Sequence, residues 1–204
     1  MRKAVTLLLV VTAVLSLAFT NPEPLRQINV VIDAGHGGND FGMTIDAHTE
    51  KAIVEQITNK IRLLNRNENI VIHLTRTVDH TMTFDQRAAF INAIKPDLVL
   101  SLHVNGNKNA DASGMEFYVS KENTAYARSH ELAGLLDKKF SDANLFTSRG
   151  VKEAGFMLLR KSEAPTVLVE MGFLSNAMDR TVLTDESGQN RIAELILEFI
   201  SELK

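Results

Sequence analysis

The feature that most constrains the fold of this chain is an alternation, from residue 28 onward, of short apolar runs with longer amphipathic segments. Several of the runs are almost continuous in Val, Ile and Leu, which predicts strands that are buried on both faces. Strands that alternate with helices are typical of a mostly parallel sheet. The predicted strands are residues 29–33, 70–75, 98–103, 115–119, 157–159 and 166–170.

The amphipathic segments carry apolar residues at helical spacing, so each predicts a helix with one buried face. The stripes are Ile53, Ile57, Ile61 and Leu64; Leu132, Leu135, Leu136 and Phe140; and Ile192, Leu195, Ile196, Phe199, Ile200 and Leu203. A shorter helix is predicted after Thr83, because Thr83 and Gln86 have capping-box spacing. The chain has 204 residues, enough for one domain but few for two. We therefore expect a single α/β domain with a mostly parallel central sheet of about six strands and helices on both faces.

The N-terminal stretch "MRKAVTLLLVVTAVLSLAFTNPEP" has two basic residues, an apolar run, and then polar residues and prolines. This is the layout of a secretory signal peptide, and the run is short for a membrane span, which needs about 20 apolar residues. We expect a signal peptide at residues 1–20, a short linker at 21–27 and the folded domain at 28–204. The protein would then be exported, to a periplasm or outside the cell, without stable membrane insertion after cleavage. An uncleaved anchor is the alternative.

Composition excludes several kinds of function. The chain has no cysteine, which rules out disulfides, thiol nucleophiles, Cys-ligated zinc and a lipid anchor on cysteine. Its formal net charge is -3 and no long cluster of Lys and Arg occurs, so nucleic acid is not an expected partner.

Polar residues stand where the predicted strands end. His36 lies just beyond the first strand, in "NVVIDAGHGGND", while His103 ends the third strand and Glu170 ends the last. In open α/β sheets, ligands bind outside the carboxyl ends of the strands, so these three side chains are expected to share one edge of the sheet. Glu50, at the start of the first amphipathic helix, is expected to reach the same place.

Two histidines and a carboxylate are a common ligand set for zinc, which takes three protein ligands in a catalytic site and leaves one position for water. A second glutamate can then transfer the proton of that water. Each residue alone also has an ordinary explanation, since a single histidine is usually structural and Glu50 suits the first turn of a helix. His48 is a further candidate near the metal. Asp33 either orients a ligand or makes local turn hydrogen bonds.

Seven motifs occur in one order: "VVIDAGHGGND", "EK", "LTR", "DLVLSLHVN", "GMEFYVS", "RGVKEAGFMLLR" and "APTVLVEMGFLSN". Together they resemble the zinc-dependent N-acetylmuramoyl-L-alanine amidases, a cell-wall amidase family, from about residue 28 to the C-terminus. The resemblance implies one Zn²⁺ per chain, with His36, Glu50 and His103 as its ligands and Glu170 as the catalytic glutamate. It also implies peptidoglycan as the substrate, cleaved between N-acetylmuramic acid and L-alanine.

The resemblance extends to Arg76, Arg87 and Asn105, which match family positions. Both arginines are expected to pair with carboxylates, and Asn105 is expected to order the loop after His103. The chain departs from the family where "TIDAHTEK" replaces a glycine-rich loop. The segment between His103 and Gly114 leaves no room for the inhibitory helix that some members carry, so we expect an open site, or control by expression and targeting. We also expect a monomer.

Other enzyme classes fit less well. "GHGG" matches neither dinucleotide- nor P-loop fingerprints, and no G-x-S-x-G elbow occurs. Two alternatives stay open: a zinc exopeptidase of similar architecture, and a non-catalytic domain that binds peptidoglycan.

Overall fold

The computed structural model describes residues 26–203, so the predicted signal peptide lies outside the described residues. A six-stranded sheet in this part consists of β1 (Ile28–Ala34), β4 (Ile70–Leu74), β5 (Leu98–Asn105), β6 (Met115–Val119), β7 (Ser148–Glu153) and β8 (Thr166–Phe173). A separate hairpin is formed by β2 (Thr44–Ile45) and β3 (His48–Thr49). The helices are α2 (Glu50–Leu64), α3 (Phe84–Ile94), α4 (Tyr126–Asp142), α5 (Met157–Lys161), α6 (Ala177–Thr184) and α7 (Glu186–Ser201).

The strand order is β4-β1-β5-β8-β6-β7. The first four strands of this order are mutually parallel, whereas β6 is antiparallel to β8 and β7 runs parallel to β6. This confirms a single α/β domain with a mostly parallel sheet. Among residues 26–203, no helix is both long and apolar enough to cross a bilayer.

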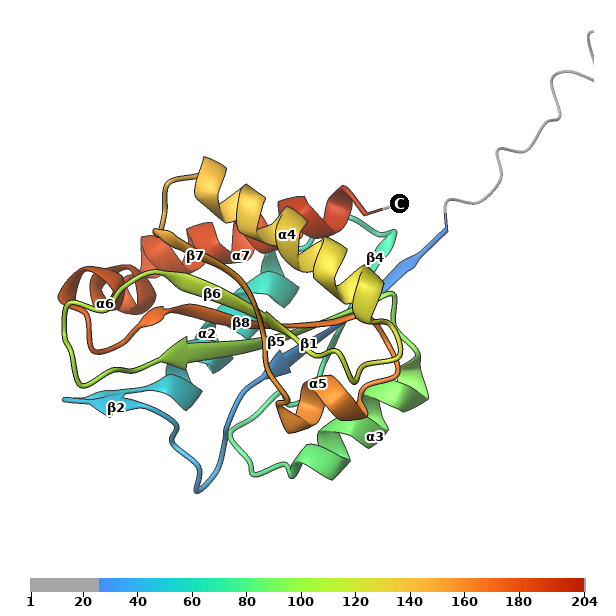
Figure 1. Cartoon of the computed structure of the whole chain (residues 1–204), viewed down its shortest axis with the longest axis horizontal. Coiled ribbons are helices and arrows are strands. Elements are labelled where there is room, and N and C mark those ends of the chain that lie inside the picture. The colour runs from blue at the N-terminus through green and yellow to red at the C-terminus, as the bar shows by residue number, and fades with distance from the viewer. Residues whose placement is uncertain (1–25, 204) are drawn as a thin grey trace, which may run out of the picture.

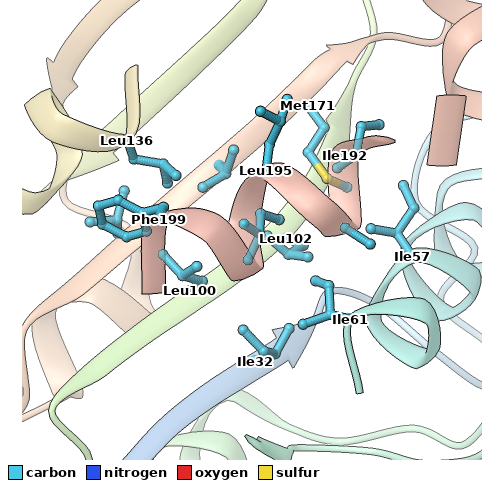
Figure 2. Packing of buried hydrophobic residues seen from close by; sticks show 14 of the residues in the cluster. Ile32, Ile57, Ile61, Leu100, Leu102, Leu136, Met171, Ile192, Leu195 and Phe199 are labelled. Carbon is cyan, nitrogen blue, oxygen red and sulfur yellow. The ribbon is translucent and has the colours of Figure 1, made fainter. Parts of the chain in front are cut away.

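Helices cover both faces of the sheet, as expected. Helices α4 and α7 lie over one side and α3 and α5 over the other (Figure 1). Helix α2 belongs to the first layer, because it packs against α7 and β5. The larger core lies between this layer and the sheet, and Figure 2 shows Ile32, Leu100 and Leu102 of the strands meeting Ile57, Leu195 and Phe199 of the helices. A smaller core, which includes Val31, Ile91 and Leu158, lies beneath α3 and α5.

Membership in one core or the other shows to which face of the sheet a side chain of the central strands points, because successive residues of a strand point to opposite sides. In β5, Leu98, Leu100, Leu102 and Val104 belong to the larger core. Val99 belongs to the smaller core, so Ser101 and His103 point to the α3 side. By the same rule, Glu170 of β8 and Glu116 of β6 also point to that side, since their neighbours belong to the larger core. The polar residues are therefore gathered on one face.

The predicted helices are found, with small differences. Thr83 caps α3 through the expected capping box with Gln86. Leu135 is 49% exposed, although it lies in the predicted stripe of α4. Helix α6 was not predicted; Asn176 caps it by accepting hydrogen bonds from its first backbone N–H groups.

One strand prediction is wrong, and three strands were not predicted: β7 of the main sheet and the two short strands of the β2–β3 hairpin. Residues 157–159 form the first part of α5, because Leu158 and Leu159 bury themselves beside α3 as a single helical turn. A run of three apolar residues does not distinguish a strand from a helix. Strand β7 was not predicted, because it is an edge strand with the sequence "SRGVKE" and mostly exposed or half-exposed residues. Such a segment shows no apolar alternation.

Candidate active site

Three of the predicted site residues meet at one point, although they come from three separate segments. Glu50 Oε1 lies 2.9 Å from His36 Nε2 and 2.9 Å from His103 Nδ1. One ligand atom from each residue falls within 4.8 Å of the others. Two imidazole nitrogens and one carboxylate oxygen are donors that suit zinc, and the convergence is close enough for one ion to contact all three residues. The residues therefore fit the metal that the sequence predicts.

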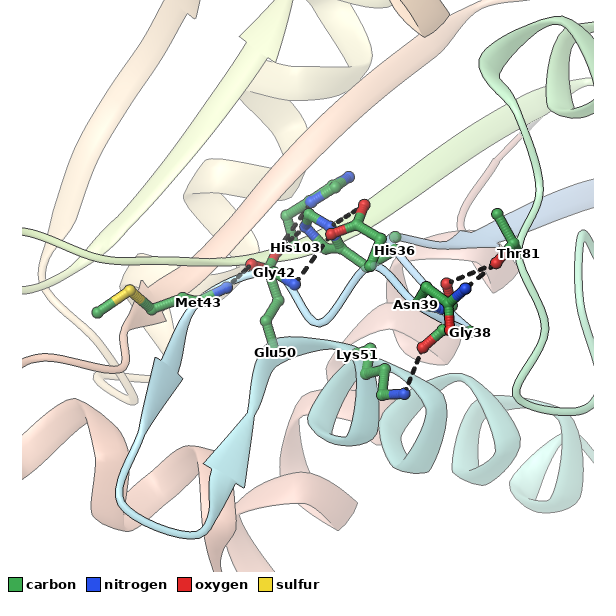
Figure 3. A network of polar contacts seen from close by, with 12 residues as sticks. His36, Gly38, Asn39, Gly42, Met43, Glu50, Lys51, Thr81 and His103 are labelled. Atoms are coloured by element: carbon green, nitrogen blue, oxygen red, sulfur yellow. Dashed lines mark hydrogen bonds and ion pairs between the residues drawn. The ribbon is translucent and has the colours of Figure 1, made fainter.

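Backbone groups hold the Glu50 carboxylate in place. Its Oε2 accepts a hydrogen bond of 2.8 Å from the Met43 N–H, and its Oε1 accepts one of 3.0 Å from the Val104 N–H. Figure 3 shows Glu50 between Met43 and the two histidines. Gly42 has a φ of 63°, and a Cβ there would lie 2.4 Å from Glu50 Oε2. The loop before Glu50 is therefore built around the carboxylate and excludes a side chain at Gly42.

Asp40 orients the His36 ring by contacting the ring nitrogen that points away from Glu50. His36 Nδ1 lies 2.8 Å from Asp40 Oδ2, so that Nε2 faces Glu50. A carboxylate on the second ring nitrogen is the usual means of setting the orientation of a metal-binding histidine. Asp40 was not among the predicted site residues. It could have been found in the sequence as an acidic residue four positions after His36 in the same glycine-rich turn.

Two buried arginines hold the backbone that carries His36. Arg87 donates to the carbonyl oxygens of Ala34, at 2.6 Å, and His36, at 2.5 Å. Arg76 donates to the Gly35 oxygen at 3.2 Å and also to Ala34. His36 has a φ of 59°, a left-handed conformation that a non-glycine residue adopts at a cost. The four hydrogen bonds stabilise this turn.

The arginines pair with carboxylates, as expected. Arg76 Nη1 lies 2.6 Å from Glu55, and Arg87 Nη1 lies 2.6 Å from Asp33. Asp33 also accepts hydrogen bonds from Thr75 and Ser101, both at 2.7 Å. Asp33 therefore neither contacts a candidate ligand side chain nor forms a local turn; it is a buried strand residue that binds Arg87. Burial alone would raise the pKa of Asp33, but Arg87 and the two hydroxyl donors hold it below its usual range.

Glu170 lies directly opposite His103 in the β5–β8 register. The register slips by one residue beyond this pair, since Asn105 pairs with Phe173. Gly172, at a φ of 124°, lies in the irregular part. Bulges of this kind re-aim side chains next to active sites. Burial raises the pKa of Glu170 to about 7, which the His103 ring opposes and the Glu50 carboxylate reinforces.

The electrostatics of the three-residue cluster favour positive charge at its centre. Burial alone would lower the pKa of His36, but the hydrogen bonds and charges of Glu50 and Asp40 raise it to about 9. Burial would raise the pKa of Glu50, but both histidines hold it far below its usual range. A proton, or a cation in its place, is therefore stabilised where the three side chains meet.

The cluster opens into a cavity of about 930 Å³. His36, Glu50, His103 and Glu170 are among the residues that line it, and Met82, Phe84, Phe156 and Met157 contribute apolar lining. Phe84 and Phe156 are 57% and 42% exposed, so this apolar lining is accessible from solvent. A cavity with a few polar groups at one end and apolar walls suits an organic ligand of moderate size.

Two further expectations can be compared with the structure. His48 is exposed on β3 and is not part of the cluster. Asn105 orders the chain after His103, because its side chain accepts a 2.8 Å hydrogen bond from the Gly106 N–H and its backbone oxygen accepts one from the Leu174 N–H.

Comparison with known proteins gives concordant matches. The chain is 30% identical over 181 residues to "Probable cell wall amidase LytH" of Staphylococcus saprophyticus, covering 87% of this chain and 59% of that relative. It is 35% identical over 182 residues to the uncharacterized protein YqiI of Bacillus subtilis, covering 87% and 85%. The structure matches the catalytic domain of CwlV, an N-acetylmuramoyl-L-alanine amidase from Bacillus (Paenibacillus) polymyxa var. colistinus. That match has a TM-score of 0.79, 32% identity, and coverage of 86% and 97%.

The sequence model of one family matches residues 30–202. This range includes all four predicted site residues and the whole sheet apart from its first two residues. By this match, and by the likeness to the CwlV domain over nearly that domain's full length, the chain belongs to the N-acetylmuramoyl-L-alanine amidase family.

Proposed function

We propose that this protein is a zinc-dependent N-acetylmuramoyl-L-alanine amidase that hydrolyses the amide bond between N-acetylmuramic acid and L-alanine in peptidoglycan. The observation that carries the proposal is the convergence of His36, Glu50 and His103 on one point, with Glu170 on the neighbouring strand. Family membership supports the substrate. We further propose that the predicted signal peptide directs the protein to the cell envelope, where peptidoglycan lies.

In this proposal, His36, Glu50 and His103 hold one Zn²⁺. When bound, the ion would polarise the substrate carbonyl and lower the pKa of a water molecule. The protein keeps the ligands ready: Asp40 orients the His36 ring, while the Met43 and Val104 N–H groups hold Glu50. Less reorganisation is then needed when the ion arrives.

Glu170 would act as the proton-transfer group. Its carboxylate would remove a proton from the attacking water, and would then deliver that proton to the alanine nitrogen as the C–N bond breaks. Burial raises its pKa to about 7, which favours a carboxyl that takes up and releases a proton near neutral pH. The products would be an N-acetylmuramic acid carboxylate and a stem peptide with a free N-terminal amine.

The proposal is tested with the purified protein on purified peptidoglycan. Mass spectrometry should find stem peptides that begin with free L-alanine. Release of single amino acids would instead support a zinc exopeptidase, and binding without any product would support a non-catalytic domain. The metal content should be about one zinc per chain.

Variants separate the two roles. Glu170→Gln should lower the rate by about 10²–10⁴-fold and keep the zinc. His103→Ala should lose the zinc itself. Glu131→Gln, a change at an exposed glutamate on α4, is the matched control and should behave as wild type. Wild-type activity in Glu170→Gln would show that Glu170 is not the base.

A further inference from the structure

Arg149 and Lys152 lie at the β6–β7 side of the candidate active site. We propose that they form a binding subsite for a carboxylate on the stem-peptide half of the substrate. The inference rests on the proposed function, since it concerns the substrate of that site. Its evidence is a group of charged side chains around Glu116 that the proposed reaction does not use.

Glu116 is the centre of this group. It lies directly opposite Glu170 in the β6–β8 register and is buried. Its Oε1 lies 2.6 Å from Arg149 Nε and 2.6 Å from Lys152 Nζ. Its Oε2 accepts hydrogen bonds from the Tyr118 hydroxyl, at 2.6 Å, and from Asn105 Nδ2, at 3.2 Å.

The charges of the group do not balance. One carboxylate faces two cations, and four donors already occupy the oxygens of Glu116. Burial alone would raise the pKa of Glu116, but Lys152, Tyr118 and Arg149 lower it to about 2, so it stays ionised. The two cations therefore outnumber the one carboxylate that they contact directly. Two other acids lie beside the group. Glu170, opposite Glu116 on β8, forms no ion pair with Arg149 or Lys152 among the described residues, and Glu153 pairs with Lys121 at 2.6 Å.

The two cations are accessible to solvent, whereas the Glu116 carboxylate that they contact is buried. The side chains of Arg149 and Lys152 are 39% and 37% exposed, against 5% for Glu116. The Lys152 ammonium has three donors and the Arg149 guanidinium has five. Glu116 takes one from each, and the Ser113 oxygen takes one more from Arg149, at 3.3 Å. Glu116 thus fixes both cations while leaving donors for an anionic ligand.

The group adjoins the cavity. Asn105, which binds Glu116, lines the cavity, and so does Phe156, whose ring packs edge-on against Tyr118 at 5.2 Å between centroids. The Lys152 ammonium contacts Glu116, one strand spacing of about 4.8 Å from the strand of Glu170. An extended peptide advances about 3.4 Å per residue. A carboxylate on the second residue after the scissile amide would therefore reach the two cations.

The charges of the substrate indicate whether its sugar half or its peptide half lies beside Arg149 and Lys152. Once the lactyl carboxyl of N-acetylmuramic acid is joined to alanine, that sugar carries no charge. The stem peptide retains carboxylates, and Arg and Lys are the side chains that bind carboxylates with charge-assisted hydrogen bonds. The β6–β7 side is therefore the peptide side of the cavity.

The test uses two synthetic muramoyl peptides that differ only at the second peptide residue, which carries a free carboxylate in one and a carboxamide in the other. The kcat and KM of the zinc-loaded enzyme are measured for both. Wild type should have the lower KM for the carboxylate. Lys152→Met should raise that KM by about tenfold or more, since hydrogen bonds to charged groups are the strong ones, and should leave kcat and the carboxamide kinetics within a few-fold.

Two control variants test whether the change in KM comes from the positive charge at Lys152. Lys152→Arg keeps the charge and should restore most of the preference for the carboxylate. Lys121→Met, at a 69% exposed lysine on the turn after β6, should change neither substrate. Zinc content and thermal unfolding of each variant show that the domain is intact, and the carboxamide substrate reports the catalytic centre in the same preparation.

The outcomes distinguish the two proposals. If wild type cleaves both peptides with equal KM, or if Lys152→Met slows both equally, the subsite is overturned and the proposed function stands. If wild type cleaves neither peptide nor peptidoglycan, the proposed function fails and the subsite fails with it.

Discussion

The buried pair of Arg87 and Asp33 offers a quantitative test of what holds the active-site turn. The two side chains are 4% and 1% exposed, and their charged atoms are 2.6 Å apart. The change Arg87→Met removes the charge and keeps much of the volume. Asp33 would keep only the Thr75 and Ser101 hydroxyls as donors, and the His36 oxygen would lose its 2.5 Å donor.

The expected loss is large, because it leaves a buried carboxylate without a counter-charge. Breaking a buried ion pair by removing one partner costs about 3–5 kcal/mol. Domains have free energies of unfolding of about 5–15 kcal/mol, so the variant should fold but with much of its stability gone. The double change Asp33→Asn with Arg87→Met should recover part of the loss, because it removes the uncompensated charge.

The pH dependence has a defined sign. The folded pKa of Asp33 lies below the unfolded value of about 3.9, so the pair stabilises the protein above pH 4. That stabilisation is lost as pH falls through the folded pKa, because Asp33 is then protonated in both states. The difference between wild type and Arg87→Met should therefore be largest near neutral pH and should shrink in acid.

Urea denaturation of the metal-free proteins at pH 7 and pH 4 measures these values. Metal is removed so that zinc binding adds nothing to the stability. Arg191→Met is the control, since that arginine is 43% exposed and pairs with Glu198 on the surface of α7. An Arg87→Met loss no larger than the control's, or a double variant no more stable than the single one, would refute the reasoning.

Four further substitutions and removal of the metal give simpler tests. Thr83→Ala removes the cap of α3 and should cost about 1 kcal/mol in urea denaturation. Phe117→Ala leaves a cavity in a fully buried site and should cost about 3–5 kcal/mol, whereas Leu63→Ala, at a 64% exposed site, should cost under about 0.5 kcal/mol. Gly42→Ala should weaken zinc affinity in a chelator competition, because its Cβ would meet Glu50. Chelation should abolish peptidoglycan hydrolysis and lower the melting temperature, and zinc should restore both.

Much of the fold could be predicted because its elements are locally encoded. Strands β1, β5 and β8 are continuous apolar runs, since helices cover both of their faces. The capping box at Thr83 is a short-range interaction that reads directly from the sequence. Strand β7 and helix α5 could not be predicted, because their conformations depend on β6 and α3, to which they attach, and their own residues show no periodic pattern.

The candidate active site, like the fold, has features that the sequence predicts and features that only the structure shows. The amino-acid sequence alone placed His36, His103 and Glu170 at or just beyond the carboxyl ends of apolar runs, each in a recognisable motif, although strands β5 and β8 continue to Asn105 and Phe173. Only the tertiary structure decided that Glu50 bridges both histidines, that Asp40 orients one of them, and that Glu116 faces Glu170. These contacts depend on strand order, on register and on the loop that returns to the sheet. Such long-range pairings arise from packing of the whole domain, and no local stretch of residues specifies them.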